Sequence, residues 1–385
     1  MTPRGRLALA LGCATYLAAW AFGSKPLYPV ALGLFAAALL SRLWTRLAGR
    51  PTELRRRLPG GDRFSGDDVH VRLELAWDKR LPAATVVRER IGKLGVRETP
   101  VHTHGATSYV LEGLGRGRYA FEEATAVIED PFGFDRVELE LSAPGALLVY
   151  PRLVELERLF SETGASARDG RRLLLRRPSG FDLHSVREYQ QGESLRMVHW
   201  RSTARRGRLM VKELEDAPRD EVAVLLDGDA RATGGESFEI AVRAAGSILQ
   251  SHLRRGRRCA LVVNSAAREA QPVTSEADWR RALETLAGAQ PDARIPAFAL
   301  LQADGGAAAR SLELVVVTSR VDVPLADRLV QRALSRRGAS LVYVQASPAP
   351  EPQLLRLQAV GIPVAVVRTG DDLAHALGAR EARVA

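Results

Sequence analysis

The chain has 385 residues, of which 46% are apolar, a formal net charge of +10 and two cysteines. This length exceeds one ordinary domain and this apolar content excludes a largely disordered chain, so we expect two or three folded units. Two cysteines exclude a disulfide framework, and arginines scattered without interleaved aromatic residues do not predict a nucleic-acid-binding protein.

Two apolar runs open the chain, Leu7–Gly23 and Pro26–Leu40, and neither contains a charged residue. A helix needs about 20 residues to cross the hydrocarbon core of a bilayer, so the second run must continue to Leu47 to span it. Aromatic residues lie mostly toward the ends of the two runs, where amphipathic rings favour the membrane interface. We therefore predict a transmembrane helical hairpin within residues 1–50, with residues 7–47 in contact with lipid.

The residues that flank these runs decide between a signal peptide and two membrane spans, and they indicate which side of the membrane the globular part occupies. Arg4 and Arg6, with Ala19–Ala21, resemble the basic start and the cleavage site of a signal peptide, but an immediate second apolar run favours two spans. Lys25 is the only charged residue between the runs, whereas arginines precede and follow them. Because basic flanks stay in the cytoplasm, we expect a protein of the cell membrane with two spans and a cytoplasmic globular part. The arginines that follow the runs are Arg42, Arg46, Arg50, Arg55, Arg56 and Arg57.

Residues 62–150 alternate apolar and polar side chains in short stretches that Gly, Pro and Asp separate, for example in Val69–Leu75. A period of two with turn residues predicts antiparallel strands in a small β-sandwich. His102 and His104 would lie on one strand face, and because no nearby carboxylate or cysteine completes a metal site, we interpret them as surface histidines. The Asp130–Phe134 segment is interpreted as a structural turn whose two phenylalanines anchor it on the sandwich.

Strand-like and helix-like segments alternate through residues 220–370. Continuous apolar runs such as Leu314–Val317 suit strands that are covered on both faces. This α/β pattern predicts a doubly wound parallel sheet, in which functional residues collect beyond the carboxyl ends of the strands. The first of these strands, Glu221–Leu226, is followed directly by Asp227 and, two residues later, by Asp229.

Three motifs occur in an order that is typical of one bacterial family. They are Asp130–Gly133, Val149–Pro151 and a long block, Gly180–Glu213, which contains Arg-x-Tyr, Arg-x-x-His-Trp and Ala-Arg and is called here the hallmark block. On these motifs most of the chain resembles the family called domain of unknown function 58, whose members look like von Willebrand factor A proteins. The resemblance implies a von Willebrand factor A-like fold for residues 220–370, with the hallmark block and a connector in residues 151–219.

The hallmark block combines arginines and glutamates, which form charge-assisted contacts, with Tyr189 and Trp200, which offer rigid amphipathic area. This composition favours a polar network or a protein-binding surface. An enzyme would use His199 as general base, with Ser202 or Ser194 as nucleophile and Glu188 beside them, but no oriented triad and no Gly-x-Ser-x-Gly elbow can be assigned. We therefore assign no catalytic residue and predict partner binding at Arg187, Tyr189, Arg196, His199, Trp200, Arg201 and Arg205.

Proteins similar to von Willebrand factor A domains bind a divalent cation through Asp-x-Ser-x-Ser and residues of other loops. Asp227 stands at the first position of this pattern, but Asp229 and Arg231 replace the two serines. Because Arg231 would place a positive charge beside the metal, the pattern leaves at most weakly bound Mg²⁺ on Asp227 and Asp229. We interpret the loop as a remnant that an internal ion pair stabilises, and we expect no other cofactor.

The resemblance also implies partners, namely a MoxR-type AAA ATPase and a transglutaminase-like membrane protein, in envelope-related or complex-assembly processes. The leading hypothesis is a membrane-anchored, noncatalytic adaptor that engages other proteins through the hallmark block. Two alternatives remain open: a hydrolase with a site of His199, Ser202 and Glu188, and a basic protein that binds nucleic acid.

Overall fold

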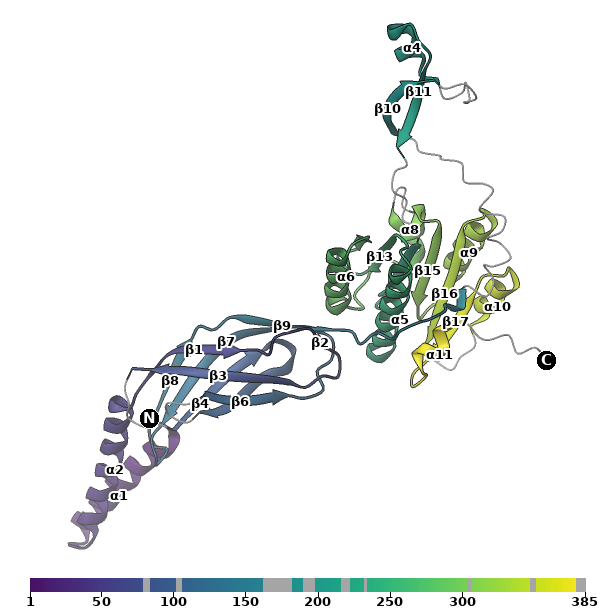
Figure 1. Cartoon of the computed structure of the whole chain (residues 1–385). Helices are drawn as coiled ribbons and strands as arrows, with labels where there is room; N and C mark the ends of the chain where they lie inside the picture. The colour runs from purple at the N-terminus through teal and green to yellow at the C-terminus, as the bar shows by residue number, and fades with distance from the viewer. Residues whose placement is uncertain are drawn as a thin grey trace. The chain divides into compact units, whose positions relative to one another are not determined.

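The computed structural model describes residues 1–78, 84–101, 106–161, 182–189, 198–215, 222–231, 234–302, 306–346 and 351–378. The chain forms two compact units, Met1–Tyr150 and Pro151–Ala385 (Figure 1). The first contains two helices and a β-sandwich, and the second contains a large α/β sheet and a small hairpin. His102, His104, Ser194 and Arg196 lie outside the described residues.

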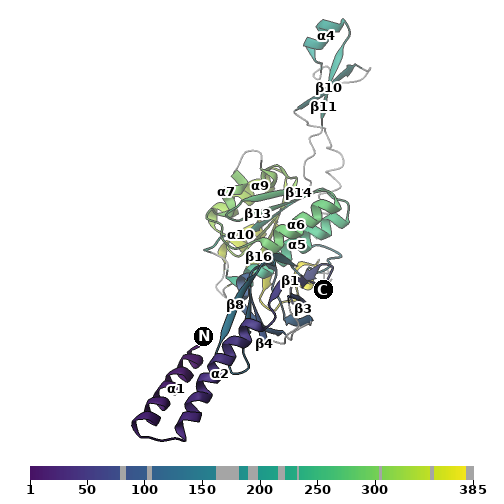
Figure 2. The same cartoon turned by 90° about the vertical axis from the view of Figure 1, so that its left-hand side faces the viewer.

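Two consecutive helices begin the chain, α1 (Pro3–Ala21) and α2 (Leu27–Leu47). They pack against each other along faces of small residues, which allow the backbones to approach, and Figure 2 shows them side by side. Among the described helices, α2 is the one that is long and apolar enough to cross a membrane, which is consistent with membrane association. The small residues buried between or beside the helices include Gly12, Ala19, Ala31 and Ala38.

The β-sandwich consists of two sheets that share one apolar core. The smaller sheet has the order β1-β3-β6, and the larger has the order β2-β9-β7-β4-β5, with β8 paired to β7. Alternate side chains of β3, such as those of Val69, Val71 and Leu73, are fully buried. The strands are β1 (Pro51–Arg57), β2 (Arg63–Phe64), β3 (Val69–Trp77), β4 (Ala84–Ile91), β5 (Gly95–Val101), β6 (Ala106–Leu111), β7 (Gly117–Glu129), β8 (Arg136–Leu141) and β9 (Gly145–Tyr150), with the 3-10 helix η1 (Gly92–Leu94) before β5.

Two features of the sandwich differ from the sequence-based expectation. The first strand begins at Pro51, ahead of residue 62, because Leu54 and Arg56 are buried within a run of arginines that resembles a membrane flank. In addition, the short strand β2 pairs in parallel with β9, so the pairing is not antiparallel throughout.

A buried ion pair joins the two sheets of the sandwich. Arg56 of β1 donates from Nη2 and Nε to Glu89 Oε1 of β4 at 2.5 and 3.1 Å. Tyr109 of β6 donates its hydroxyl to the other oxygen, Glu89 Oε2, at 2.7 Å. The guanidinium also donates to the Ala143 carbonyl at 2.6 Å and lies 4.1 Å from the centre of the Phe121 ring. Both charges are therefore balanced and hydrogen-bonded inside the core, as a buried pair requires.

The Asp130–Phe134 turn between β7 and β8 lies against the ends of both helices. Thr2, which caps α1, donates from its backbone N–H and its hydroxyl to carbonyls of the turn at 3.0 and 2.6 Å. In the last turn of α2, Thr45 donates its hydroxyl to Asp135 Oδ2 at 2.7 Å. Phe132 at the tip is 62% exposed, so the expectation that both phenylalanines anchor the turn on the sandwich is wrong for this ring.

The second unit is built on a six-stranded sheet with the order β14-β13-β12-β15-β16-β17. Neighbouring strands pair in parallel except β14, which pairs antiparallel with β13. Side chains of β12 alternate between two cores, with Val224 in one and Leu225 in the other, so the strands are covered on both faces. The antiparallel edge strand β14 was not predicted, because it is only five residues long and contains Pro272, a residue that is unfavourable in strands.

The strands of this sheet are β12 (Val222–Asp227), β13 (Cys259–Asn264), β14 (Glu269–Val273), β15 (Glu313–Thr318), β16 (Gly338–Gln345) and β17 (Val364–Arg368). The helices are α5 (Gly235–Arg254), α6 (Glu276–Gly288), α7 (Ala297–Gln302), α8 (Ala307–Arg310), α9 (Val323–Leu334), α10 (Pro352–Ala359) and α11 (Leu373–Leu377).

A strap formed by residues 151–161 packs along α5. Leu156 and Leu159 belong to the apolar core beneath this helix. The backbone of the strap is held by two serines of the helix, because the Val154 N–H donates to Ser247 Oγ at 3.0 Å and Ser251 Oγ donates to the Leu156 carbonyl at 3.1 Å. The strap is thus part of the α/β unit, although 60 positions of sequence separate Ser161 from Glu221.

Candidate functional site

The hallmark block folds in part into an antiparallel hairpin of β10 (Asp182–Glu188) and β11 (Met210–Glu215), with the short helix α4 (Trp200–Arg206). Val198 and Met210 are buried, as is Val211, which forms a bridge with Val198. These apolar contacts hold the start of α4 against β11.

His199 and Ser202 meet at the start of α4. The His199 ring caps the helix, because its Nδ1 accepts from the Ser202 N–H at 3.3 Å and lies 2.7 Å from Ser202 Oγ. The His199 N–H donates to the Met210 carbonyl at 2.7 Å, which fixes His199 at the start of β11. The structure therefore brings together two residues of the alternative hydrolase site, while the third, Glu188, forms an ion pair with Arg208 at 2.8 Å.

Trp200 is the prominent exposed side chain of this element, with 68% of its surface accessible. Arg201 and Arg205, one helical turn apart on α4, are exposed as well. Tyr189 is half-buried, and its backbone N–H donates to the Leu209 carbonyl at 2.9 Å. Of the predicted partner-binding residues, those described with side chains are thus gathered around one hairpin and its helix; the side chain of Arg187 is not among the described ones.

A second polar cluster lies at the carboxyl edge of the large sheet, where three neighbouring parallel strands end. β12 ends at Asp227, β13 at Asn264 and β15 at Thr318. Asn264 Nδ2 donates to Asp227 Oδ1 at 2.8 Å, and Thr318 Oγ1 donates to Asp227 Oδ2 at 2.8 Å. All three side chains are buried. In open α/β sheets ligands bind at this edge, and Asp227 lies there as the sequence predicted.

Asp229 lies two residues beyond this cluster, and Arg231 contacts both of its carboxylate oxygens. Arg231 Nη2 donates to Oδ2 at 2.7 Å, and Nε and the backbone N–H donate to Oδ1 at 3.0 Å each. The ion pair predicted for this loop is therefore present. A guanidinium in this position competes with a cation for the same oxygens, so the donors present do not fit the divalent metal that the resemblance implies. In the part of the chain that the structure describes, no three His, Cys, Asp or Glu side chains form a metal-binding group.

The two carboxyl groups differ in their electrostatics. Burial raises the pKa of Asp227, although hydrogen bonds from Asn264 and Thr318 oppose the effect. Hydrogen bonds from Arg231 lower the pKa of Asp229. A lowered pKa means that the stabilisation by this pair is present above the ordinary aspartate pKa and is lost as the pH falls through the lower folded-state value.

We expect millimolar Mg²⁺ to leave the thermal stability of the wild-type chain unchanged and to raise that of Arg231→Ser. The substitution releases both Asp229 oxygens and restores a hydroxyl beside them. At a tenfold excess of Mg²⁺ over its Kd, binding adds about 1.4 kcal/mol to the free energy of unfolding. The matched control is Arg310→Ser, an exposed arginine at the end of α8, which should behave as wild type. Equal Mg²⁺ stabilisation of all three proteins would contradict this expectation.

Sequence reasoning missed two members of the cluster, Asn264 and Thr318. Their signal was present, because each ends an apolar strand in the way that Asp227 ends the first strand. β12 pairs in parallel with β13 and β15. Because the carboxyl ends of neighbouring parallel strands lie at one edge of the sheet, the residues that end these strands lie close together.

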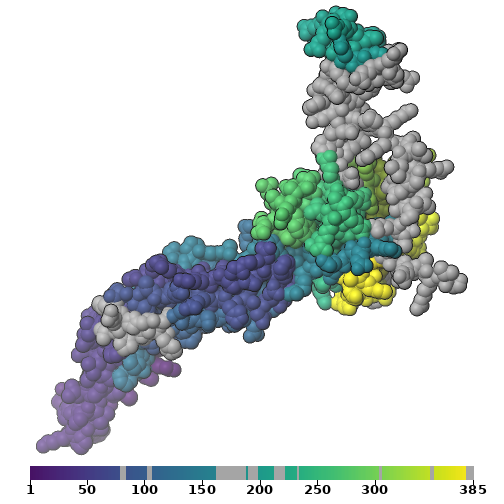
Figure 3. All heavy atoms as spheres, viewed as in Figure 1, coloured from purple at the N-terminus to yellow at the C-terminus, as the bar shows by residue number. Residues whose placement is uncertain are grey.

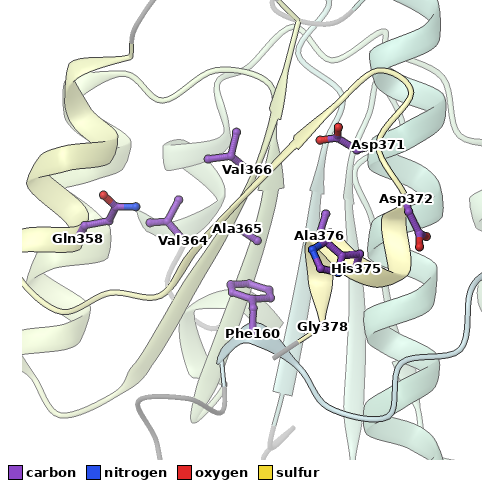
Figure 4. Close-up of a pocket in the computed structure, with 10 residues that line it drawn as sticks. All are labelled: Phe160, Gln358, Val364, Ala365, Val366, Asp371, Asp372, His375, Ala376 and Gly378. Atoms are coloured by element: carbon purple, nitrogen blue, oxygen red, sulfur yellow. The ribbon is translucent and has the colours of Figure 1, made fainter. Parts of the chain in front are cut away.

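A cavity of 340 Å³ lies apart from both clusters, beside β17 and α11 (Figure 4). Its walls combine the apolar side chains of Phe160 and Val364 with the polar side chains of Asp371, Asp372 and His375. It shares no residue with the Asp227 cluster or with the hallmark block, and we assign it no ligand.

Comparisons with known proteins give one curated relative, "Uncharacterized protein YeaD" of Bacillus subtilis (strain 168), which is 26% identical over 220 residues. The match covers 56% of this chain and 53% of that protein, so the chain spans about half the length of this relative.

Two solved structures resemble parts of the chain only distantly. The PKD domain of an M14-like peptidase from Thermoplasmatales archaeon SCGC AB-540-F20 has a TM-score of 0.18 and 14% identity, covering 26% of this chain and 100% of that one. Cwp6 from Clostridium difficile has a TM-score of 0.15 and 8% identity, covering 76% of this chain and 37% of that one. Neither supports an argument about the fold. The family signal is more specific: residues 185–342, which include most of the hallmark block and the Asp227 cluster, match the family described as "Protein of unknown function DUF58".

Proposed function

We propose that this chain is a membrane-anchored, noncatalytic adaptor that engages partner proteins through the hallmark block. One observation carries the interaction part of the proposal, namely the exposure of Trp200 among exposed arginines on a structured helix. Tryptophan and arginine are the residue types most enriched at the energetic centres of protein interfaces. A tryptophan left in water contributes little to the fold, so contact with a partner is the better explanation of its placement.

The anchor is α2, with α1 beside it as a second span. Arg4 and Arg6 at the start of α1 and Arg42 and Arg46 at the end of α2 lie at one end of the helix pair, and the basic end favours the cytoplasm. In a chain with Cys13 and Cys259 replaced, a membrane-impermeant thiol reagent applied to intact cells should label a cysteine at Lys25. A cysteine at Phe64 should be labelled only after permeabilisation. Labelling of both in intact cells would contradict this orientation.

The partner we propose is a MoxR-type AAA ATPase, with a transglutaminase-like membrane protein as a further member of the assembly. The proposal rests on the family resemblance and on the exposed hairpin, in envelope-related or complex-assembly work. The α/β unit then serves as a degenerate von Willebrand factor A-like scaffold, in which Arg231 supplies the positive charge next to Asp229.

We expect Trp200→Ala to weaken binding of a purified MoxR-type ATPase to the full-length chain in detergent by about 2 kcal/mol or more, roughly 30-fold in Kd. Arg206→Ala is the matched control, because Arg206 is exposed on the same helix and stands outside the predicted set. Titration calorimetry or pull-down at several ATPase concentrations gives the measurement. Unchanged affinity in Trp200→Ala would remove α4 from the interface.

A further inference from the structure

We propose that the Asp130–Phe134 turn of the sandwich is a third membrane contact, which places the Phe132 ring in the interface of an anionic bilayer beside the ends of α1 and α2. This inference rests on the membrane anchor proposed above and adds to it a contact made by the globular part. It commits to one partner, the surface of a bilayer that contains anionic phospholipid.

The depth of the turn follows from its bond to α2. Leu27 and Thr45 are 18 residues apart on this helix, so Thr45 lies about 27 Å from its start. The hydrocarbon core of a bilayer is about 30 Å thick, so a membrane-spanning α2 carries Thr45 to the far boundary of that core. The 2.7 Å hydrogen bond between Thr45 Oγ1 and Asp135 Oδ2 therefore fixes the turn at the level of the interface.

The contact with α1 sets the same level independently. The Thr2 N–H donates to the Phe134 carbonyl at 3.0 Å. Gly5, in the first turn of α1, lies so close to the turn that a Cβ added there would be 2.2 Å from the Phe134 carbonyl oxygen. A side chain at this position is thus incompatible with the contact, which indicates that helix and turn are closely packed. In Figure 3 the purple atoms of the helices continue directly into the atoms of the sandwich.

Backbone hydrogen bonds to Asp130, not the ring of Phe132, hold the conformation of the turn. Asp130 Oδ1 accepts from the Asp135 N–H at 2.6 Å, and Asp130 Oδ2 accepts from the Phe132 N–H at 2.9 Å. The Phe132 ring stacks on Phe134, with ring centres 5.9 Å apart, and stays 62% exposed. A rigid loop that presents a phenylalanine to the outside at this depth suits insertion among lipid headgroups.

Charge around the turn favours anionic lipid. The exposed Arg4 has its Nη1 3.7 Å from the position of a Cβ on Gly133, which places its guanidinium beside the turn. Arg6 on α1 and Arg42 and Arg46 on α2 are exposed at the same helix ends. Cations near an anionic membrane surface each add attraction, and the aromatic ring adds apolar contact. The combination fits a bilayer surface better than either feature alone.

Lipid-dependent quenching at single labelled sites tests this inference on the full-length chain. With Cys13 and Cys259 replaced, a cysteine at position 132 carries an environment-sensitive NBD fluorophore in vesicles of phosphatidylglycerol and phosphatidylcholine. We expect blue-shifted emission and strong quenching by lipids that carry a nitroxide near the headgroup. The substitution is suited to the test, because the exposed ring does not hold the turn together.

Two further sites make the outcomes distinguishable. Phe64→Cys is the matched phenylalanine control. β2 pairs with the end of β9, which in turn pairs with the start of β7, and the 13 residues of β7 put about 40 Å of strand between that point and the turn, so the label should stay unquenched. Leu39→Cys, exposed on α2 about 18 Å from its start, reports the anchor and should be quenched by lipids that carry the nitroxide on the acyl chain. Quenching at 39 but not at 132 would overturn the inference and leave the anchor intact. No quenching at either site would overturn both.

Discussion

Glu89→Ala should lower the free energy of unfolding of the sandwich by about 3–5 kcal/mol. The substitution removes the carboxylate and leaves the Arg56 guanidinium buried without its counter-charge, and it also removes the acceptor of the Tyr109 hydroxyl. Side-chain exposures of 5% for Arg56 and 2% for Glu89 mean that water cannot replace the lost partner. Urea unfolding of the full chain in detergent, followed by pulse proteolysis of the sandwich, measures the effect.

Glu98→Ala is the matched control for this prediction. Glu98 of β5 pairs with Arg88 of β4 at 2.6 Å, but both side chains are solvent-accessible, so the loss should stay below about 1 kcal/mol. The double variant Arg56→Met with Glu89→Leu should recover much of the stability, because it removes both charges and keeps apolar volume. Equal losses in Glu89→Ala and Glu98→Ala would show that the interior pair does not behave as buried.

Replacing His252 should remove a large part of the acid sensitivity of the α/β unit. His252 lies in the last turn of α5, where burial lowers the pKa of its imidazole to about 4. Arg257 Nη1 contacts its Nδ1 at 3.2 Å, and its buried Nε2 has no hydrogen-bond partner among the described residues. Burial and the Arg257 cation disfavour the charged ring, and together they outweigh the attraction of Glu313, which pairs with Arg257 at 2.8 Å.

The direction of the pH effect follows from the lowered pKa. The unfolded chain takes up a proton near pH 6.5 and the folded chain only near pH 4, so stability present above pH 6.5 is lost as the pH falls through this interval. The loss reaches about 3 kcal/mol, since one pKa unit corresponds to about 1.4 kcal/mol. In His252→Gln the free energy of unfolding should decline less between pH 6.5 and 4, whereas the exposed His375→Gln should follow wild type. Identical slopes in all three proteins would contradict the assignment.

The sequence predicts the parts of this fold whose signals are local. Alternation in β3 and the continuous apolar runs of β12 and β15 indicate their strands directly, because the side-chain period reports which faces are covered. The strand β1 was not predicted, because its signal is not local. Arg56 resembles a solvated membrane flank, and only its partner Glu89, 33 residues away in sequence, makes its burial favourable.

The candidate sites also divide into features with a local sequence signal and features that depend on contacts between distant residues. Asp227 was predicted from its place after an apolar strand. The ion pair of Asp229 with Arg231 was predicted from the family resemblance, because these two residues replace the serines of the cation-binding pattern. The bond from Asn264 to Asp227 depends on which strands are neighbours, which the sequence alone does not state. The exposed position of Phe132 likewise depends on the contact of the turn with Thr2, about 130 residues earlier.

The strap along α5 shows that the hallmark hairpin is inserted within the α/β unit and does not precede it. Because residues 151–161 already fill core positions beneath α5, the polypeptide enters the α/β unit, departs to form β10, α4 and β11, and returns at β12. The hairpin is thus an insertion in the α/β unit, since the strap before it and β12 after it both pack in the core of that unit. In such an arrangement the sequence of the hairpin can change without altering the packing contacts of the core of the α/β unit.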